Sequence, residues 1–392
     1  VRRAYKFRMR PTARQHVRLA ACLDAHRELY NAALQERRDA WVQGRTRIAY
    51  EDQAAQLTEI RVVRSDIAVW SYSSQQATLR RLNKTFELFF HRLKAAGKAG
   101  YPRFKGPGRF DSVEWPKDGD GARWHADKKR VYLRGIGQVK VTAHREVLGR
   151  VKTIQIRRQG RRWMLVLSCD DVPRNPLPPT GRQVGVDLGI ANFAITSDGS
   201  HVSNPRWARS AAHKLTEAQR RFTRAMRGSN NRARKGEIVA ARQRKIANAR
   251  RDYHHKTALQ IVRCYDLIAL EHLAIANMIC RAKPVHGSEP QRPFLPNGGA
   301  AKTGLNRSIV DAGWGQFITI LRAKAEDAGR ICIVVNPRNT SICCEACGHT
   351  AKENRATQAV FICRACGHTT QADEQAARNI LRAGLALHAT IA

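Results

Sequence analysis

The sequence predicts a multidomain α/β protein, and three observations lead to this fold class. Helical periodicity dominates residues 13–93, short strand-like segments follow over residues 109–172, and strands alternate with helices after residue 181. The Pro-rich stretch from Pro173 to Gly181 is typical of a linker. With 392 residues, the chain is long enough for two or three packed units, because domains usually span about 100 to 200 residues.

The N-terminal half is predicted to combine helices with a small β-barrel or sandwich. Residues 2–9 alternate as in a strand, and apolar residues at helical spacing mark helices over residues 17–34 and 79–93. The second helix also carries basic residues outside its apolar face, namely Arg80, Arg81 and Lys84. They are expected either to face solvent or to line a groove for nucleic acid. Four short strands are then expected, at residues 131–133, 139–142, 154–156 and 163–167.

The C-terminal half opens with the apolar strand at residues 184–190 and passes into a basic helical stretch. Residues 201–251 contain 15 Lys and Arg but only 2 Asp and Glu, which is too lopsided for ion pairing between neighbouring turns. We therefore expect a helix that lies along phosphates. Further elements follow in this order: a strand at 266–270, a Pro- and Gly-rich loop at 284–304, a helix at 313–328, a strand at 331–335 and a last helix from about Asp373.

The net charge indicates a polyanionic partner. The chain carries 70 Lys and Arg against 32 Asp and Glu, a formal charge of +38, and self-repulsion of this size opposes a compact state unless a polyanion neutralises it. Nucleic acid is the expected polyanion. The sequence has no run of about 18 apolar residues that could span a bilayer and no apolar signal-peptide core, so we expect a cytoplasmic protein without membrane association.

Cysteines near the C-terminus predict a structural zinc ribbon. Ten cysteines in a chain without a secretion signal argue against a disulfide framework. Cys344 and Cys347 form one Cys-x-x-Cys turn, Cys363 and Cys366 form a second, and a glycine follows each. Four thiolates suit one tetrahedral Zn²⁺ ion with no open position for catalysis. A thioredoxin-like redox pair is the alternative, and Cys343 is expected to be a neighbour of the site, not a ligand.

Three acids stand in contexts that suggest a second metal centre. Asp187 interrupts an apolar strand between Gly185 and Gly189, where a lone carboxylate is costly to bury and the glycines leave room for a substrate backbone. Glu271 ends another apolar strand, so both acids can project from the same sheet edge. Asp373 begins the last helix, where a simple helix cap is the alternative. Together they would form an all-oxygen site suited to two Mg²⁺ ions about 4 Å apart, as in phosphodiester cleavage.

Other catalytic motifs are missing from the sequence. It contains no Walker A loop, no HExxH motif and no G-x-S-x-G elbow, so ATP-driven, metalloprotease and α/β-hydrolase functions lack support. His254 and His255, on the basic helical stretch, are expected to contact phosphate or solvent and not a metal ion.

Motifs along nearly the whole chain resemble those of the transposon-encoded TnpB family, also called OrfB, to which the type V CRISPR nucleases are similar. The motifs that carry the resemblance are Tyr5-Lys-Phe-Arg-Met-Arg-Pro-Thr12, Tyr101-Pro-Arg-Phe-Lys105, Gly185-Val-Asp-Leu-Gly-Ile190, Leu270-Glu-His-Leu273 followed by Met278, Asn339-Thr-Ser341, and Asp373 leading Ala376-Ala-Arg-Asn-Ile380. In this combination and order they are highly specific.

The resemblance implies an RNase H-like (RuvC) nuclease domain over residues 181–392, with a zinc ribbon inserted at 338–370. Asp187, Glu271 and Asp373 would be the ligands of two catalytic Mg²⁺ ions. It also implies a helical recognition lobe over residues 12–108 and a β-barrel wedge domain over 109–180, with residues 1–11 as its first strand. Where the family commonly has Asn two residues after the last aspartate, this chain has Gln375, and an altered hydrogen bond there is expected to affect cutting rate more than metal binding.

The expected function is that of an RNA-guided DNA endonuclease, which holds a guide RNA and reads a short motif beside its double-stranded DNA target. Three alternatives stay open: a compact type V CRISPR effector that uses a CRISPR RNA, a non-cleaving RNA-guided repressor, against which the intact acids argue, and a transposase that joins DNA ends. The oligomeric state is left open between monomer and homodimer. Contacts to nucleic acid are expected from Arg80, Arg81, Lys84, Arg103, Lys105, Arg220, Arg224, Arg242 and Lys245.

Overall fold

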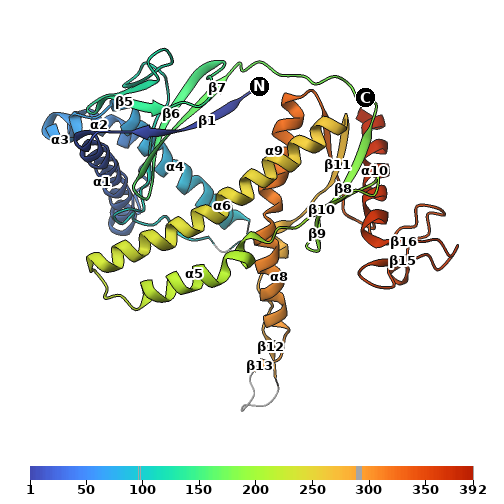
Figure 1. Cartoon of the computed structure of the whole chain (residues 1–392). Helices are drawn as coiled ribbons and strands as arrows, with labels where there is room; N and C mark the ends of the chain where they lie inside the picture. Colours follow the sequence, from blue (N-terminus) through green and yellow to red (C-terminus); the bar gives the residue numbers. More distant parts are fainter. Residues whose placement is uncertain (96, 98, 288–293, 392) are drawn as a thin grey trace. The chain divides into compact units, whose positions relative to one another are not determined.

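The computed structural model describes residues 1–95, 97, 99–287 and 294–391, and the chain divides into two compact units, residues 1–173 and 174–392 (Figure 1). No helix within these described residues is long and apolar enough to cross a membrane.

Unit 1 contains a seven-stranded sheet in which every neighbouring pair is antiparallel. The strand order is β2-β6-β7-β1-β5-β4-β3. The strands are β1 (Arg3–Arg10), β2 (Ser112–Trp115), β3 (Ala122–His125), β4 (Arg130–Leu133), β5 (Gly137–Thr142), β6 (Arg150–Gln159) and β7 (Arg162–Asp170). The N-terminal strand β1 lies inside this sheet, between β5 and β7, with Phe7 opposite Leu165 and Met9 opposite Val141. Segments far apart in sequence therefore share one core, which includes Tyr5, Phe7 and Met9.

Four helices complete unit 1, and they interrupt the sheet between β1 and β2. They are α1 (Ala13–Gly44), α2 (Tyr50–Val63), α3 (Ser65–Ala68) and α4 (Tyr72–Lys94). Thr12 and Gln15 form a capping box at the start of α1, which satisfies backbone donors that the first helical turn leaves free. The apolar stripe predicted for the second helix is buried in α4 at Leu79, Leu82 and Phe86.

Unit 2 is built on a five-stranded mixed sheet in the order β10-β9-β8-β11-β14. Its strands are β8 (Gln183–Asp187), β9 (Asn192–Thr196), β10 (His201–Ser203), β11 (Leu267–Glu271) and β14 (Ile331–Val335). The strands β8, β11 and β14 are parallel, whereas β9 and β10 pair antiparallel. Two short hairpins, β12 (Val285–His286) with β13 (Phe294–Leu295) and β15 (Val360–Ile362) with β16 (Thr369–Gln371), lie outside this sheet.

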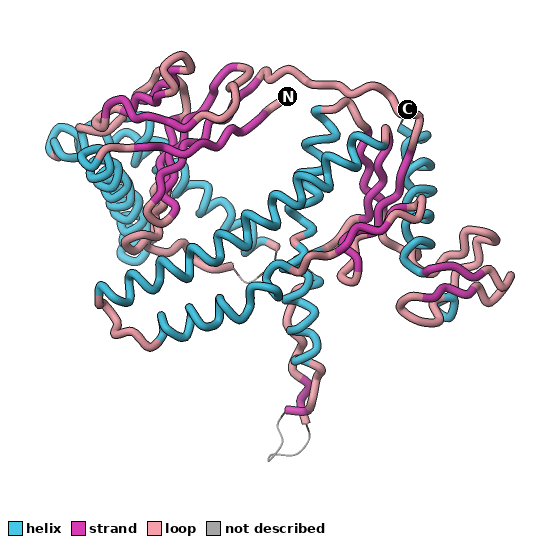
Figure 2. Tube along the Cα trace, viewed as in Figure 1, coloured by secondary structure: helices cyan, strands magenta, loops and turns pink. Residues whose placement is uncertain are grey.

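Helices cover both faces of this sheet (Figure 2). The helices of unit 2 are α5 (Trp207–Thr223), α6 (Asn230–Cys264), α7 (Ile275–Met278), α8 (Gly299–Ala312), α9 (Trp314–Asp327) and α10 (Ala372–Ile391), with a short 3-10 turn at Lys352–Asn354. Val186 and Leu270 pack toward α6 and α9, and Ala269 packs toward α10. This follows from the alternation of side chains along a strand.

Gly185 serves this packing and not the approach of a substrate. A Cβ atom at Gly185 would lie 2.0 Å from the carbonyl oxygen of Ala377 in α10. The expectation that this glycine leaves room for a substrate backbone is therefore wrong. The missing side chain instead allows α10 to lie close against β8.

Two predicted segments differ from expectation. Residues 201–251 do not form one helix, because β10 and a loop precede α5, and a turn after Thr223 folds α5 back along α6. The predicted loop at 284–304 contains the β12–β13 hairpin and the start of α8, and its residues 288–293 lie outside the described residues.

The predicted linker is anchored to unit 2 along its length. The backbone N–H of Asn175 donates to the carbonyl of Asp327 at 2.9 Å, and that of Leu177 donates to Ala328 at 3.1 Å. Thr180 donates its backbone N–H and hydroxyl to the Asp266 carboxylate. The division between units consequently falls after Pro173, ahead of the boundary expected at residue 180.

Candidate active site, zinc site and basic surfaces

The three predicted acids meet at the carboxyl-terminal edge of β8 and β11. Side chains alternate along a strand, so Asp187 lies on the same face as Gly185, and Glu271 on the same face as Ala269. That face carries α10, whose second residue is Asp373. Val186 pairs with Leu270, which places Asp187 beside Glu271 on neighbouring strands. Such strands lie about 4.8 Å apart, a spacing at which carboxylates can share cations.

The electrostatics of Asp187 show that the acids act on one another. Burial, followed by the charges of Glu271 and Asp373, raises the pKa of Asp187 to about 7. Arg355 and the backbone N–H of Leu188 oppose this rise. A cation placed among the acids would relieve the repulsion, and carboxylate oxygens are the ligands that Mg²⁺ prefers. The residues present therefore fit a hard divalent cation.

Glu271 is held by a loop that follows β14. The hydroxyl of Thr340 donates to Oε1 of Glu271 at 2.6 Å. Burial raises the pKa of Glu271, and this hydrogen bond opposes the rise. The Thr340 carbonyl in turn accepts from Nδ2 of Asn379 at 2.8 Å, so α10 fixes the loop that orients the carboxylate.

Asp373 is paired with an arginine from the ribbon. Nη2 of Arg355 lies 3.0 Å from Oδ1 of Asp373, and both side chains are largely buried. Arg355 follows the 3-10 turn at Lys352–Asn354, between the two cysteine pairs. Arg355 belongs to the ribbon. Among the described residues, it is the one basic side chain that forms an ion pair with an acid of this site.

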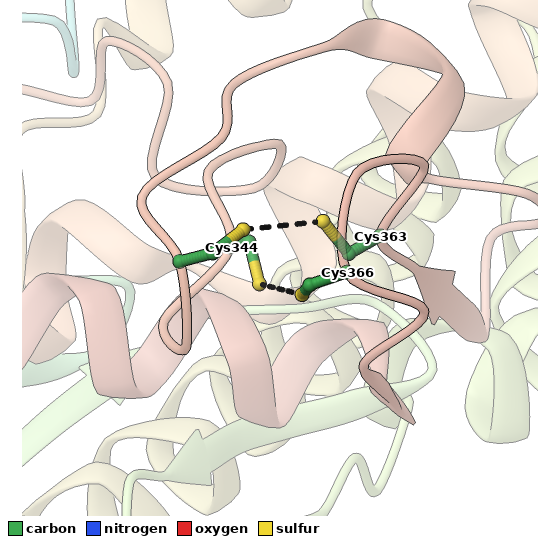
Figure 3. Close-up of side chains that lie close together, drawn as sticks. Cys344, Cys363 and Cys366 are labelled. Carbon is green, nitrogen blue, oxygen red and sulfur yellow. Dashed lines mark hydrogen bonds between the residues drawn. The ribbon is translucent and has the colours of Figure 1, made fainter.

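The four predicted zinc ligands converge (Figure 3). The ligand atoms of these four cysteines all lie within 4.8 Å of one another. Among the described residues, no other group of three or more Cys, His, Asp or Glu side chains is as close, and the three carboxylates are farther apart. Sγ of Cys344 lies 3.7 Å from Sγ of Cys366, and Sγ of Cys347 lies 3.5 Å from Sγ of Cys363. Zn–S bonds of about 2.3 Å in a tetrahedron imply S···S separations of about 3.8 Å. The thiols therefore fit one Zn²⁺ ion.

The two cysteine turns repeat one local structure. Gly348 and Gly367 both have a positive φ, 77° and 72°, a conformation that glycine adopts without strain. Each glycine donates its N–H to the carbonyl of the first cysteine of its pair, at 3.0 Å in both turns. Although burial opposes it, the backbone amides of Cys366 and Ala365 and the neighbouring thiols lower the pKa of Cys363 to about 6. Although a backbone hydrogen bond from His349 opposes it, the neighbouring thiols raise the pKa of Cys347 to about 12, so without a metal ion the thiols share a negative charge unequally.

Gln375 faces the ribbon and not the three acids. Its side chain is fully buried, and Nε2 donates to the carbonyl of Cys343 at 2.9 Å. Asn379, one turn later in α10, donates to the same carbonyl at 2.7 Å. The Cys343 side chain is outside the thiol cluster and accepts a hydrogen bond from Arg382 at 3.2 Å.

The basic residues predicted in unit 1 differ in their surroundings. Arg80, Arg81 and Lys84 line an open cavity of about 460 Å³ between α4 and β2. Arg81 also donates to the Ser112 carbonyl at 3.2 Å and lies over the Phe110 ring, so part of its role is structural. Lys105 lies over the Tyr30 ring, whereas Arg103 is exposed.

In unit 2, Arg220 and Arg224 are exposed along and after α5, and Lys245 is exposed on α6. Arg242 is half-buried and lines a small cavity between α5 and α6. The expectation for His254 is wrong: it is fully buried, packs against Phe193 and Phe317, and shares a 3.0 Å hydrogen bond with the Ala312 carbonyl.

Sequence reasoning missed Arg355 and Thr340 as side chains that contact the acids. Thr340 lies within the motif Asn339-Thr-Ser341, so a signal for it was present. Arg355 is one of many arginines, and its sequence neighbours give no sign of the contact with Asp373.

Comparison with known proteins identifies the family of the chain. Residues 165–281 match the OrfB_IS605 family model, described as "Probable transposase". Residues 314–380 match the "Cas12f1-like, TNB domain" model, and residues 1–46 match a "Helix-turn-helix domain" model of the same OrfB_IS605 group.

Two curated relatives span nearly the whole chain. The Escherichia coli K12 protein described as "Putative RNA-guided DNA endonuclease InsQ" is 32% identical over 99% of this chain and 93% of its own length. A "Putative RNA-guided DNA endonuclease" of Streptomyces pristinaespiralis is 29% identical over 99% and 91%. Among solved structures, a Cas12f1–sgRNA–target DNA complex aligns with a TM-score of 0.55 at 16% identity, covering 93% of this chain and 82% of that chain, which shows a shared fold. The chain belongs to the TnpB (OrfB) family, which is related to the type V CRISPR effectors.

Proposed function

We propose that this protein is an RNA-guided DNA endonuclease of the TnpB type. The observation that carries the proposal is the meeting of Asp187, Glu271 and Asp373 at one sheet edge, where burial, followed by the charges of Glu271 and Asp373, raises the pKa of Asp187 to about 7. Membership of the family and the printed names of two full-length relatives support the guided character of the reaction.

Unit 2 is the proposed RuvC nuclease domain. Its first strand, β8, is central, with antiparallel β9 and β10 on one side and parallel β11 and β14 on the other. This order supports the RNase H-like fold that the resemblance implies. Asp187, Glu271 and Asp373 would hold two Mg²⁺ ions, which when bound supply a nucleophile at neutral pH and stabilise the leaving oxygen of the phosphodiester.

Two neighbouring side chains, Thr340 and Arg355, hydrogen-bond to the acids. Thr340 keeps the Glu271 carboxylate oriented and favours its ionised form. Arg355 bonds Asp373 and offsets part of the repulsion among the acids. The ribbon carries Arg355, so the zinc-bound thiolates would fix that arginine's position from outside the reacting centre.

Guide RNA and double-stranded DNA are the proposed partners. The formal charge of +38 exceeds what a short duplex contact requires, and residues 201–251, which contain α5 and part of α6, carry 15 Lys and Arg against 2 Asp and Glu. In unit 1, the sheet with β1 as an inner strand would form the wedge domain, and α1 to α4 the recognition lobe. Arg80 and Lys84 would lie along a nucleic-acid groove there.

A compact CRISPR effector is the second candidate. The match of residues 314–380 to a Cas12f1-like domain and the structural likeness to Cas12f1 favour it. A non-cleaving repressor would not need all three acids, which are intact. The RNA bound to the protein in its own cells separates the first two readings, because a CRISPR RNA carries repeat sequence and a transposon guide carries the transposon end.

The proposal is tested with the protein purified together with its RNA. The complex should cut DNA that matches the guide segment, lose activity when the RNA is digested, and recover it when the RNA is restored. Asp187→Ala, Glu271→Ala and Asp373→Ala should each abolish cutting while target binding persists. Cutting that survives removal of the RNA, or full activity in an acid variant, would contradict the proposal.

A further inference from the structure

Near the sheet edge that carries the acids, unit 2 contains an arginine-lined cavity. None of the basic residues predicted to contact nucleic acid lines it. It is open to solvent, measures about 980 Å³ and is bounded by parts of α5, α6 and α8 and by three loops, which contain Ile190, Asn204 with Arg206, and Ile279 with Arg281. One loop residue is Ile190, three positions after Asp187, and another is Ile279, which follows β11 and Glu271 through α7. These two loops leave the same sheet edge at which the acids lie.

The cavity has a strong excess of positive charge. Its charged lining consists of Arg206, Arg209, Arg250, Arg281, Arg307 and a single acid, Asp311. Asp311 is already engaged, because its carboxylate accepts the backbone N–H of Ala208 at 2.8 Å and lies 3.9 Å from Arg250. It therefore caps α5 and leaves the remaining arginines without a counter-charge.

Four of these arginines are available to a ligand. The side chains of Arg206, Arg209, Arg281 and Arg307 are exposed and form no ion pair or hydrogen bond with any residue that the structure describes. Guanidinium groups bind phosphate through paired N–H donors, and a line of them suits a repeating phosphodiester more than one small anion.

Two half-buried side chains join the elements that form the cavity. Asn306 donates Nδ2 to the carbonyl of Ile279 at 2.9 Å, which bonds α8 to the loop after α7. Nη1 of Arg250 donates to the Val310 and Asp311 carbonyls, which bonds α6 to α8. The exposed arginines are therefore carried by elements that are bonded to one another.

We propose that this cavity seats the DNA strand on its way to the three acids, by holding phosphates that flank the scissile bond. The inference rests on the proposed function and adds the strand-binding surface and its residues. Among the described residues, no aromatic side chain lines the cavity, so binding there would not use base stacking and would be independent of sequence. DNA is preferred to guide RNA as the occupant because the loops that form the cavity leave the edge that carries the acids.

Photocrosslinking of the RNA-bound complex tests the location directly. The probe is matched target DNA with one azidophenacyl group on a phosphorothioate at a single position near the mapped cut. Crosslinked peptides from residues 204–212 or 303–311 are the expected result. Crosslinks confined to other peptides, or crosslinks from 4-thiouridine-labelled guide RNA to these two segments, would overturn the assignment.

Substitution tests the contacts themselves. Arg209→Ala and Arg307→Ala should each reduce the cutting rate roughly tenfold at low DNA concentration and lower the slope of log rate against log salt by about 0.7 for each lost phosphate contact. Arg209→Lys should restore most of the salt slope. The control is Arg263→Ala, an exposed arginine in the last turn of α6 that does not line the cavity.

Failure of guided cutting and failure of strand binding in the cavity give different results. If the unaltered complex does not cut guided DNA, the proposed function is wrong. If it cuts, and Arg209→Ala and Arg307→Ala match Arg263→Ala in rate and salt slope, only the cavity assignment is wrong. Loss of bound RNA from the two cavity variants would show that the cavity holds RNA, which also contradicts the proposal.

Discussion

Thr340 donates its hydroxyl to Glu271 at 2.6 Å, and the Thr340 carbonyl is held by Asn379 of α10. One loop thus connects a carboxylate at the end of β11 with the helix that carries Asp373. The acids are contributed by three separate elements, and this loop is part of what keeps them in register.

Removing that hydroxyl should slow cutting. Thr340→Val is expected to reduce the rate about tenfold, because Glu271 loses an orienting hydrogen bond. The same bond lowers the pKa of Glu271, so its loss should move the acid limb of the pH–rate profile to higher pH. Thr340→Ser keeps the hydroxyl and should keep the profile. An unchanged profile in Thr340→Val would show that the contact does not influence Glu271.

Asp187 should make the metal-free protein less stable as pH rises from about 4 to about 7, whereas the buried His26, whose pKa is lowered to about 4, acts in the opposite direction. Asp187 binds its proton more tightly in the folded protein, because its pKa is raised from the ordinary 3.8 to about 7, so deprotonation over this range favours unfolding. The upper bound is about 4 kcal/mol, since one pKa unit corresponds to about 1.4 kcal/mol. Urea denaturation in EDTA at several pH values measures it. Asp187→Asn should remove this contribution, so that its stability changes more favourably with rising pH than that of the unaltered protein. The same slope in both proteins would exclude Asp187 as a source of the dependence.

Zinc should be present at about one equivalent for each chain and should stabilise the ribbon. Cys344→Ser and Cys363→Ser are expected to lose the metal, because each removes one of four converging thiolates. Cys343→Ser is the matched control, since its sulfur lies outside the cluster and should leave the metal content unchanged. Elemental analysis and thermal unfolding measure both effects. Full zinc content in the Cys344 and Cys363 variants would refute the assignment.

Gly185→Ala should destabilise unit 2 by about 2 kcal/mol or more, because the added methyl group would lie 2.0 Å from a backbone oxygen of α10. Gly304→Ala is the control: it lies within α8 with nothing within 4 Å of the added atom, and should leave stability unchanged or raise it by about 0.5 to 1 kcal/mol. The denaturation midpoints of the two variants give the comparison. Equal midpoints would mean that β8 and α10 do not pack as closely as described.

The sequence predicted the acids and the thiols because each has a local signature. A carboxylate inside an apolar strand, as at Asp187, or a Cys-x-x-Cys pair, is conspicuous without knowledge of its neighbours. Strand alternation then explains why Asp187 and Glu271 share a face. The glycine at 185 was misinterpreted because the atom it avoids belongs to Ala377, which is almost two hundred residues away in sequence.

Features that depend on distant partners could not be predicted in this way. His254 lies in a basic stretch, and only the tertiary structure shows that Phe193 and Phe317 enclose it. The turn that separates α5 from α6 follows Thr223. The segment is basic on both sides of this turn, so the charge pattern does not indicate where the first helix ends. Arg355 and the arginine-lined cavity likewise arise from chain segments that meet only after folding.

Guide exchange asks whether the bound RNA selects the DNA that is cut. The RNA is removed from the purified protein and replaced with RNAs that differ only in the guide segment, and the ends of the cut DNA are sequenced. The cut site should move to the DNA that matches each new guide, and mismatches next to the adjacent motif should prevent cutting more strongly than distant ones. Cuts that stay at the original site, or that occur without RNA, would contradict guided cleavage and leave a basic, metal-dependent nuclease.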